Sequence, residues 1–169
     1  MLFYVDSFLS ENERLDLLCT AYSADSSSWS IKSSGNAYWI GNRFPFESPI
    51  FDELNNRIFQ YFKEYSRITP FCAIQRIQSG GAMGEHSDNY EETCRFGCSV
   101  YLNDNFDGGE LVYPRLMTSH KPINGRLVIH TATEPHLVNT VSNGTRYMLT
   151  CFVYGDNHQN TSITNASEH

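Results

Sequence analysis

The sequence lacks the features expected of secreted, membrane-bound or nucleic-acid-binding proteins. Its five cysteines are odd in number and form no Cys-x-x-Cys pair, so neither a disulfide framework nor a cysteine zinc site is predicted. No apolar run approaches the ~20 residues that cross a bilayer, and the start, MLFYVDSFLSENERLDLL, lacks the basic beginning of a signal peptide. The formal net charge of −7 argues against binding to nucleic acid or to an anionic membrane. We therefore expect a cytoplasmic protein with neither kind of partner.

Size and composition indicate one globular domain. The chain has 169 residues, 40% of them hydrophobic, with 11 Phe and 10 Tyr, which is enough to build a substantial core. We predict a single domain over residues 1–156, with helical support in about residues 1–66 and a β core in about residues 70–156. The polar segment 157–169 is expected to be a flexible tail.

Two helices are predicted in the first third of the chain. Ser10 and Glu13 form the pattern of a capping box, which predicts a helix through about Tyr22. Its apolar positions are expected to share one face: Leu15, Leu18 and Cys19. The second helix is predicted to begin at Ser48-Pro49 and to carry an apolar stripe at helical spacing: Ile50, Phe51, Leu54, Ile58, Phe59 and Phe62.

From Phe71 onward the pattern changes to short strands separated by Gly-Gly, Asp-Gly and Asn-Gly turn signals. Six consecutive strands after two helices predict a mostly β fold, either an antiparallel sandwich or a small barrel backed by helices. His120 lies between predicted strands and is expected to be a surface histidine in a loop. The predicted strands lie in the segments FCAIQRIQS, GCSVYLN, GELVYP, GRLVIH, PHLVNTVS and RYMLTCFVY.

A histidine and an aspartate two residues apart are candidate metal ligands. In GAMGEHSDNY, His86 and Asp88 project to the same face if the segment is extended, because side chains alternate along a strand. Such a pair also occurs by chance in solvated turns, so a metal site needs a third ligand. His136, at the start of a later strand, is the first candidate. His130, which ends the preceding strand, is the second, and its alternatives are a core histidine or a group that contacts a ligand.

Two histidines and one carboxylate on one face of an octahedron are typical of non-haem Fe(II) oxygenases, although zinc hydrolases use the same donors. The last predicted strand offers a way to distinguish them. Alternation places four of its side chains on a common face: Arg146, Met148, Thr150 and Phe152. An arginine inside a barrel would need an anionic partner such as a dicarboxylate cosubstrate. The alternative is that Arg146 points to solvent after the Asn-Gly turn.

Taken in order, these residues resemble the 2-oxoglutarate/Fe(II) dioxygenases, in particular the prolyl 4-hydroxylase-like branch that includes the oxygen-sensing prolyl hydroxylases. The shared pattern is His86-x-Asp88, then His136, then Arg146 ten residues later. The connecting segments YLNDNFDGGELVYP, KPINGRLVIH and PHLVNTVSNGTRYMLTCFVYGD resemble successive strands of that branch, and FLSENERLDLL resembles the helix before its barrel. The similarity spans nearly the whole chain and is most specific from Gly80 to Asp156.

The resemblance implies a mostly β fold, with a double-stranded β-helix (jelly-roll) core and two supporting N-terminal helices. It implies that the metal is Fe(II) and that its ligands are His86, Asp88 and His136. It also implies that 2-oxoglutarate is the cosubstrate, with ascorbate as an optional further cofactor. The residues implied to hold 2-oxoglutarate are Arg146, Tyr101 and Thr150.

Five residues are candidates for contacts with a substrate or with the metal ligands: Ile77, Met83, Arg95, His130 and Phe152. Ile77 stands near the position where relatives often carry a pocket tyrosine, and Met83 stands where another aromatic residue is frequent. Phe152 replaces a common tryptophan, and His130 stands where a large apolar residue is expected. Arg95 lies near a substrate-side arginine of the relatives, but its spacing to the YLN segment is one residue shorter.

The implied activity is hydroxylation of a C–H bond by a 2-oxoglutarate- and Fe(II)-dependent dioxygenase, with O2 as the other cosubstrate. The predicted substrate is a prolyl residue in a protein or peptide, and residues 31–46 are predicted to form a loop over it. Two alternatives stay open. One is hydroxylation of a free amino acid or other small molecule, and the other is a non-catalytic jelly-roll module that binds a metal or ligand. The sequence carries no prediction of oligomeric state.

Overall fold

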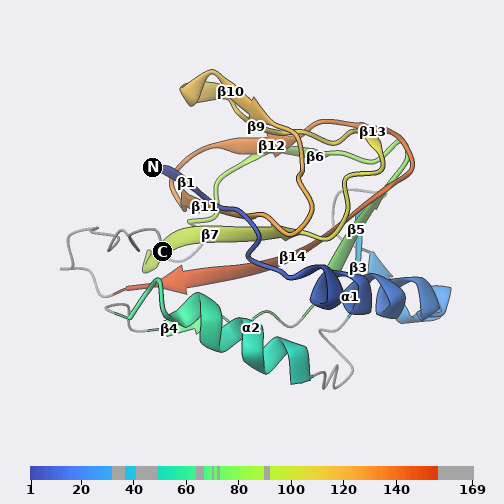
Figure 1. Cartoon of the computed structure of the whole chain (residues 1–169). Helices are drawn as coiled ribbons and strands as arrows, with labels where there is room; N and C mark the ends of the chain where they lie inside the picture. Colours follow the sequence, from blue (N-terminus) through green and yellow to red (C-terminus); the bar gives the residue numbers. More distant parts are fainter. Residues whose placement is uncertain are drawn as a thin grey trace.

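The computed structural model describes residues 1–31, 37–40, 49–63, 67–69, 71, 73–89 and 92–155. Within these residues a larger and a smaller β-sheet lie in two layers, and the two helices lie beneath the larger sheet (Figure 1). Helix α1 comprises Glu11–Ser23 and helix α2 comprises Pro49–Phe59. The prediction of a mostly β jelly-roll with two supporting helices is confirmed.

The larger sheet is antiparallel throughout and is centred on β7 and β14. Its strands run in the spatial order β1 (Leu2–Val5), β11 (Leu127–Thr131), β7 (Cys94–Tyr101), β14 (Thr145–Tyr154), β5 (Ile74–Gln78), β3 (Ala37–Ile40) and β2 (Ser30–Ile31). A further short strand, β4 (Arg67–Thr69), pairs with the end of β14. The first third of the chain therefore contributes strands to this sheet as well as the two helices.

The smaller sheet has the order β10 (Thr118–His120), β9 (Leu111–Tyr113), β12 (His136–Val138) and β6 (Met83–His86). A two-stranded sheet of β13 (Val141–Asn143) and β8 (Asp107–Gly108) lies beside it, and the short 3-10 turns are Ser26–Ser28 and Pro114–Leu116. Because β6 and β12 are neighbours here, the two segments that carry His86 and His136 are brought together. This pairing joins residues far apart in the sequence.

Two separate apolar cores follow from the alternation of side chains along β14. Tyr147, Leu149 and the other side chains of one face pack with the helices in the core beneath the larger sheet. Met148, on the opposite face, packs with Tyr101 and Tyr113 in a second core between the two sheets. The candidate site lies on this second face of β14, where the sheets face each other.

Helix α1 begins where the capping box predicts but buries a different face from the one expected. The Ser10 amide donates to Glu13 Oε2 at 2.6 Å, and the Ser10 hydroxyl accepts from the Glu13 amide. Leu15 and Cys19 are exposed, and the buried residues are Arg14, Leu17, Leu18 and Ala21. Arg14 belongs to the buried face because its Nη1 donates to the Leu102 carbonyl at 2.8 Å, while its Nε and Nη2 pair with Glu11.

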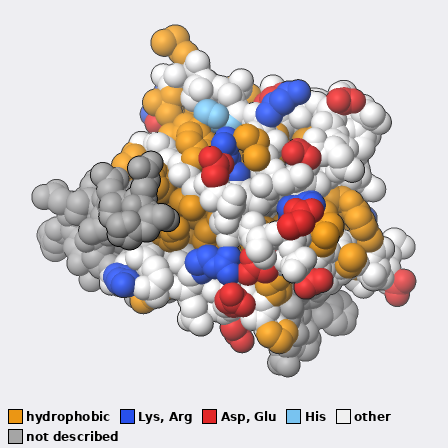
Figure 2. Space-filling view, in the orientation of Figure 1, with side chains coloured by type: hydrophobic (Ala, Val, Ile, Leu, Met, Phe, Trp, Pro, Cys, Tyr) orange, Lys and Arg blue, Asp and Glu red, His pale blue; other side chains and the backbone are white. Residues whose placement is uncertain are grey.

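His120 lies in strand β10 and not in a loop, which corrects the prediction for this residue. It pairs with Leu111 in the β9–β10 hairpin, and its Nε2 shares a hydrogen bond with the Tyr4 hydroxyl. Apolar atoms cover the projecting end of this hairpin at the top of Figure 2, where Met117 is 93% exposed. On the same face of the molecule acidic and basic side chains are interspersed.

Residues 31–46, predicted to cover the substrate, include strand β3 at 37–40 and the last residue of β2. Residues 37–40 pair with β5 in the larger sheet, so this part of the candidate loop is a strand. Residues 32–36 and 41–46 lie outside the described residues, as does the predicted tail 157–169. None of the helices formed by the described residues is long and apolar enough to cross a membrane.

Candidate metal and cosubstrate site

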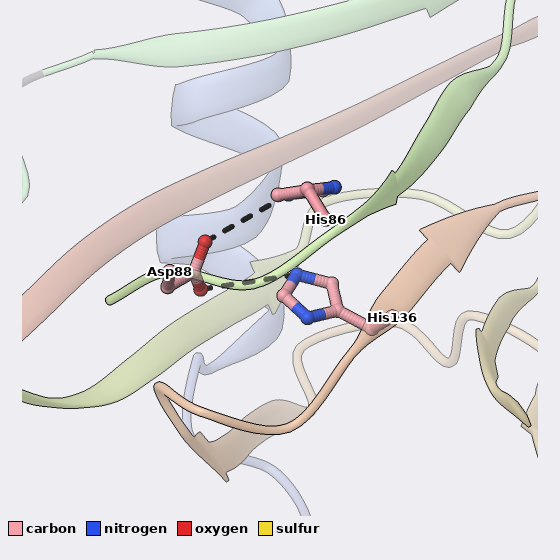
Figure 3. Close-up of side chains that lie close together, drawn as sticks. All are labelled: His86, Asp88 and His136. Carbon is pink, nitrogen blue, oxygen red and sulfur yellow. Dashed lines mark ion pairs between the residues drawn. The ribbon is translucent and has the colours of Figure 1, made fainter. Parts of the chain in front are cut away.

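His86, Asp88 and His136 bring one ligand atom each to within 4.8 Å of one another. His86 ends β6 and lies directly opposite His136, the first residue of β12. Asp88 follows β6, and its amide donates to the Ala132 carbonyl at 2.8 Å, which holds this turn against the residues after β11. His86 Nε2 lies 3.7 Å from Asp88 Oδ1, and His136 Nε2 lies 3.8 Å from Asp88 Oδ2 (Figure 3). This donor set suits a divalent metal ion.

Both histidines are oriented by backbone carbonyls. His86 Nδ1 lies 2.8 Å from the Gly84 carbonyl oxygen, and His136 Nδ1 lies 3.0 Å from that of Glu134. A carbonyl only accepts, so each Nδ1 carries a hydrogen, and each ring directs its Nε2 toward Asp88. Burial, followed by the nearby charge of His130, lowers the pKa of His136 to about 4. The imidazole of His136 is therefore neutral at neutral pH, which is the form that binds metals.

The Asp88 carboxylate is buried but keeps its charge. Burial acts to raise its pKa, but the hydrogen bond from His130 and the charges of the surrounding histidines lower it below the ordinary value. An ionised carboxylate beside two imidazoles supplies one negative charge to a metal ion. The three side chains thus fit Fe(II), which accepts two imidazoles and one carboxylate on a single face.

His130 contacts Asp88 and does not belong to the cluster of three potential ligands. Its Nε2 lies 2.9 Å from Asp88 Oδ2, and its Nδ1 lies 3.1 Å from the Tyr113 hydroxyl. Among the described residues, the group whose ligand atoms lie within 4.8 Å of one another contains His136 and leaves His130 out. Of the two histidines considered for the third ligand position, His136 is the one that the geometry favours.

A cavity extends from the three ligand candidates along β14. Its lining includes the three ligand candidates, His130, Gln75, Met83, Arg146, Met148, Thr150 and Phe152. The four alternate residues of β14 predicted to share one face therefore all reach the cavity. Thr150 Oγ1 accepts a hydrogen bond from Gln75 Nε2 at 2.9 Å. Leu111, Val138 and Met148 add apolar side chains to the lining of the cavity.

Arg146 is completely buried, so the alternative in which it points to solvent is wrong. Its Nη1 donates to the Met148 sulfur, whereas Nε and Nη2 have no hydrogen-bond partner among the described residues. The guanidinium carbon lies 5.0 Å from the centre of the Tyr101 ring. Burial lowers the pKa of Arg146, and the proximity of Tyr101 partly offsets this effect. A buried cation with two unpaired nitrogens at the edge of a cavity fits a carboxylate ligand, which accepts from guanidinium in a two-pronged geometry.

The remaining candidates divide between the cavity and other parts of the fold. Met83 and Phe152 line the cavity, as expected of residues near a substrate. Ile77 does not, because it is buried in the core between the sheets. Arg95 is also absent from the described lining residues, and its Nη1 donates to the Glu92 carbonyl at 2.9 Å. Sequence reasoning missed Gln75 and Tyr113, whose only sequence signal is their position in β-rich segments.

Comparison with known proteins agrees with this geometry. The family model described as "2OG-Fe(II) oxygenase superfamily" matches residues 72–154, the part of the chain that contains all the ligand candidates and Arg146. No curated protein sequence matches the chain at a significant level.

Several solved structures share the fold at low sequence identity. The viral collagen prolyl hydroxylase of Paramecium bursaria chlorella virus-1 in complex with 2-oxoglutarate matches with a TM-score of 0.73 and 17% identity, covering 91% of this chain and 95% of that one. A prolyl-4-hydroxylase of Pseudomonas putida gives 0.70 and 19%, with coverages of 91% and 92%. A Trichoplax adhaerens prolyl hydroxylase, bound to a hypoxia-inducible factor peptide fragment, gives 0.67 and 19%, with coverages of 92% and 84%.

The family match covers the strands that build the cavity, and the buried donor set and the unpaired arginine fit the two groups that such enzymes require. We conclude that the chain is a 2-oxoglutarate-dependent non-haem iron dioxygenase whose residues 72–154 match the model of the 2-oxoglutarate–Fe(II) oxygenase superfamily.

Proposed function

We propose that this dioxygenase hydroxylates a prolyl residue in a protein or peptide, with Fe(II) held by His86, Asp88 and His136 and with 2-oxoglutarate held by Arg146. The observation that carries the cosubstrate assignment is the burial of the Arg146 cation with two unpaired nitrogens in the cavity that also contains the ligand candidates. The prolyl substrate is supported by the likeness of the fold to the viral, bacterial and animal prolyl hydroxylases.

When bound, Fe(II) and 2-oxoglutarate supply an oxidative decarboxylation in which one atom of O2 enters a substrate C–H bond and the other enters succinate, with release of CO2. The chain supplies orientation and charge. His86 and His136 present Nε2, and ionised Asp88 contributes a negative charge. These groups are preorganised by the backbone, which avoids a reorganisation cost when the metal binds.

In the same cavity, Arg146 is proposed to pair with the distal carboxylate of 2-oxoglutarate through Nε and Nη2. Burial raises the pKa of Tyr101 despite the opposing charge of Arg146, so its hydroxyl keeps its proton and donates to the same carboxylate. Thr150 adds a second hydroxyl, whose oxygen already accepts from Gln75. The apolar side chains of the lining exclude water and so strengthen these charge interactions.

Succinate formation in the presence of Fe(II), 2-oxoglutarate and O2 tests the proposal. A library of proline-containing peptides is compared with matched peptides in which proline is replaced by alanine, and with free L-proline. A prolyl substrate is supported if a proline peptide stimulates succinate formation and neither its alanine counterpart nor free L-proline does. The product should carry one additional oxygen atom on the proline. Stimulation by the free amino acid alone would assign the enzyme to small molecules instead.

Two variants separate cosubstrate binding from nonspecific effects. Arg146→Met should abolish succinate formation at moderate 2-oxoglutarate concentration, because the distal carboxylate loses its cationic partner. Arg115→Met removes an exposed arginine and should leave the activity unchanged. If Arg146→Met and Arg115→Met are equally active, 2-oxoglutarate does not bind where we propose.

A further inference from the structure

His130 is a buried histidine that lies between a candidate metal ligand and a buried tyrosine. It is 2% exposed, on β11, and it contacts Asp88 through Nε2 and Tyr113 through Nδ1. Tyr113 itself is completely buried on β9, in the opposite sheet. The three side chains thus form a continuous hydrogen-bonded chain from the smaller sheet, through the larger sheet, to the candidate metal centre.

The charge of Asp88 fixes the direction of its hydrogen bond with His130. An ionised carboxylate only accepts, so Nε2 of His130 carries the hydrogen that it donates to Oδ2. Burial strongly raises the pKa of Tyr113, so its hydroxyl keeps its proton, and this hydroxyl lies 3.1 Å from His130 Nδ1. His130 thus carries a hydrogen on Nε2, whereas His86 and His136 carry one on Nδ1.

The neighbouring strand leaves space for the contact between His130 and Asp88. Gly97 lies directly opposite His130 in the pairing of β7 with β11. A Cβ atom on Gly97 would lie 2.2 Å from Asp88 Oδ2 and 2.6 Å from His130 Nε2, closer than non-bonded atoms approach. The absence of a side chain at this position is what allows the carboxylate and the imidazole to meet.

We propose that His130 is a positioning residue for Asp88: its hydrogen bond to Oδ2, with the imidazole ring held by Tyr113, holds the carboxylate so that Oδ1 is presented to the metal. The inference rests on the proposed Fe(II) site and deepens it. Oδ1 lies 3.7 Å from His86 Nε2 and Oδ2 lies 3.8 Å from His136 Nε2, but Oδ2 is also occupied by His130 at 2.9 Å. Hydrogen bonds to ligating carboxylates fix the orientation of the ligand and raise metal affinity.

The test is the affinity for Mn(II), a redox-stable probe of the site, measured by isothermal titration calorimetry without 2-oxoglutarate. His130→Phe fills the same space with an apolar ring but removes the donor, and should weaken Mn(II) binding by about 10- to 100-fold. His130→Gln retains an N–H at a similar distance from the backbone, and should recover most of that loss. Melting temperatures identify variants that do not fold.

A merely structural role for His130 would give a different pattern. Equal weakening in His130→Phe and His130→Gln, or wild-type affinity in His130→Phe, would overturn the proposal. With saturating Mn(II), the affinity for 2-oxoglutarate should remain within about twofold of wild type in both variants, because Arg146 is not altered. Loss of 2-oxoglutarate affinity under those conditions would indicate general damage to the cavity and would also count against a positioning role.

Tyr113→Phe keeps the proposal testable if the His130 variants do not fold, because it removes only one hydroxyl. We expect Mn(II) affinity to fall about 3- to 10-fold, since the hydroxyl no longer holds the His130 ring. Unchanged Mn(II) affinity in Tyr113→Phe would overturn the proposed role of the hydrogen bonds from Tyr113 through His130 to Asp88. The Mn(II) measurements do not depend on turnover. If the wild-type protein binds Mn(II) but forms no succinate, the proposed function is refuted. The role of His130 is still tested in that case, because it depends only on the Mn(II) titrations.

Discussion

The guanidinium of Arg146 lies against the ring of Tyr101, 5.0 Å from its centre, and neither side chain is exposed to solvent. Nitrogens Nε and Nη2 of the arginine and the hydroxyl of the tyrosine all lack a hydrogen-bond partner among the residues that the structure describes. An uncompensated buried charge costs several kcal/mol. The unliganded fold therefore bears a cost at this pair that a bound carboxylate would remove.

Replacing Arg146 by methionine should separate the stability of the protein from its affinity for the cosubstrate. The loss of two charge-assisted hydrogen bonds should weaken 2-oxoglutarate binding by at least about 100-fold. The free energy of unfolding of the unliganded protein should stay the same or rise by about 1–3 kcal/mol, because the buried charge is gone. Calorimetry with Mn(II) present and urea denaturation without ligand measure the two quantities.

The matched control is Arg115→Met, which changes an exposed arginine in the 3-10 turn Pro114–Leu116. It should alter neither quantity by more than about 0.5 kcal/mol. If Arg146→Met instead destabilised the unliganded protein strongly, the arginine would be an internal structural cation with a partner, and the cosubstrate assignment would lose its main support.

Tyr101→Phe tests whether the unpaired hydroxyl beside Arg146 acts on the same ligand. The substitution removes a buried hydroxyl without changing the ring that packs against Arg146. We expect 2-oxoglutarate affinity to fall about 10-fold and unliganded stability to stay equal or rise by about 1 kcal/mol. A decrease in stability with unchanged affinity would show that the hydroxyl serves the core between the sheets.

The parts of the site that follow from local periodicity could be predicted from the sequence. Alternation along one strand placed Arg146 and Thr150 on a common face, and both line the cavity. The His86–Asp88 pair projects together for the same reason. The ordered family resemblance from Gly80 to Asp156 supplied the jelly-roll fold, which no single motif would establish, and the family model matches almost the same segment.

Features that depend on the register between distant strands could not be predicted. The chain from Tyr113 to His130 requires β9 of one sheet to face β11 of the other, and nothing near either residue in the sequence encodes that. His120 was expected on the surface because its contact with Tyr4 comes from the opposite end of the chain. The buried face of α1 does not follow from local spacing, because the hydrogen bond from Arg14 to the Leu102 carbonyl joins residues 88 positions apart.

Gly97→Ala should disrupt the metal site, because the new methyl group would lie 2.2 Å from Asp88 Oδ2. We expect Mn(II) affinity to fall by about 100-fold and the free energy of unfolding to fall by about 1–3 kcal/mol, as in other overpacked interiors. Gly84→Ala is the control, since a Cβ there would meet no atom within 4 Å and the carbonyl that orients His86 is retained. Equal Mn(II) affinity in the two variants would contradict the packing argument.

Glu13 links the two helices and should make their packing sensitive to acid. Its Oε2 accepts from the Ser10 amide, and its Oε1 accepts from Arg57 Nη2 at 2.6 Å. The hydrogen bond from Arg57 lowers the pKa of Glu13 to about 2 from an ordinary value of 4.5, although partial burial acts in the opposite direction. A lowered pKa in the folded state stabilises the protein above about pH 4.5, and this contribution disappears as the pH falls toward 2.

Glu13→Gln should therefore lower the free energy of unfolding by about 1 kcal/mol at neutral pH, a value reduced for solvent screening. The difference from wild type should shrink as the pH falls from about 4.5 toward 2, because protonation removes the same charge from the wild-type protein. Urea denaturation across this pH range measures it. Glu53→Gln, which removes the exposed partner of Arg57 at 3.0 Å, should change stability by less than about 0.5 kcal/mol. If the loss of unfolding free energy in Glu13→Gln is as large near pH 2 as at neutral pH, the side chain acts through packing and not through its charge.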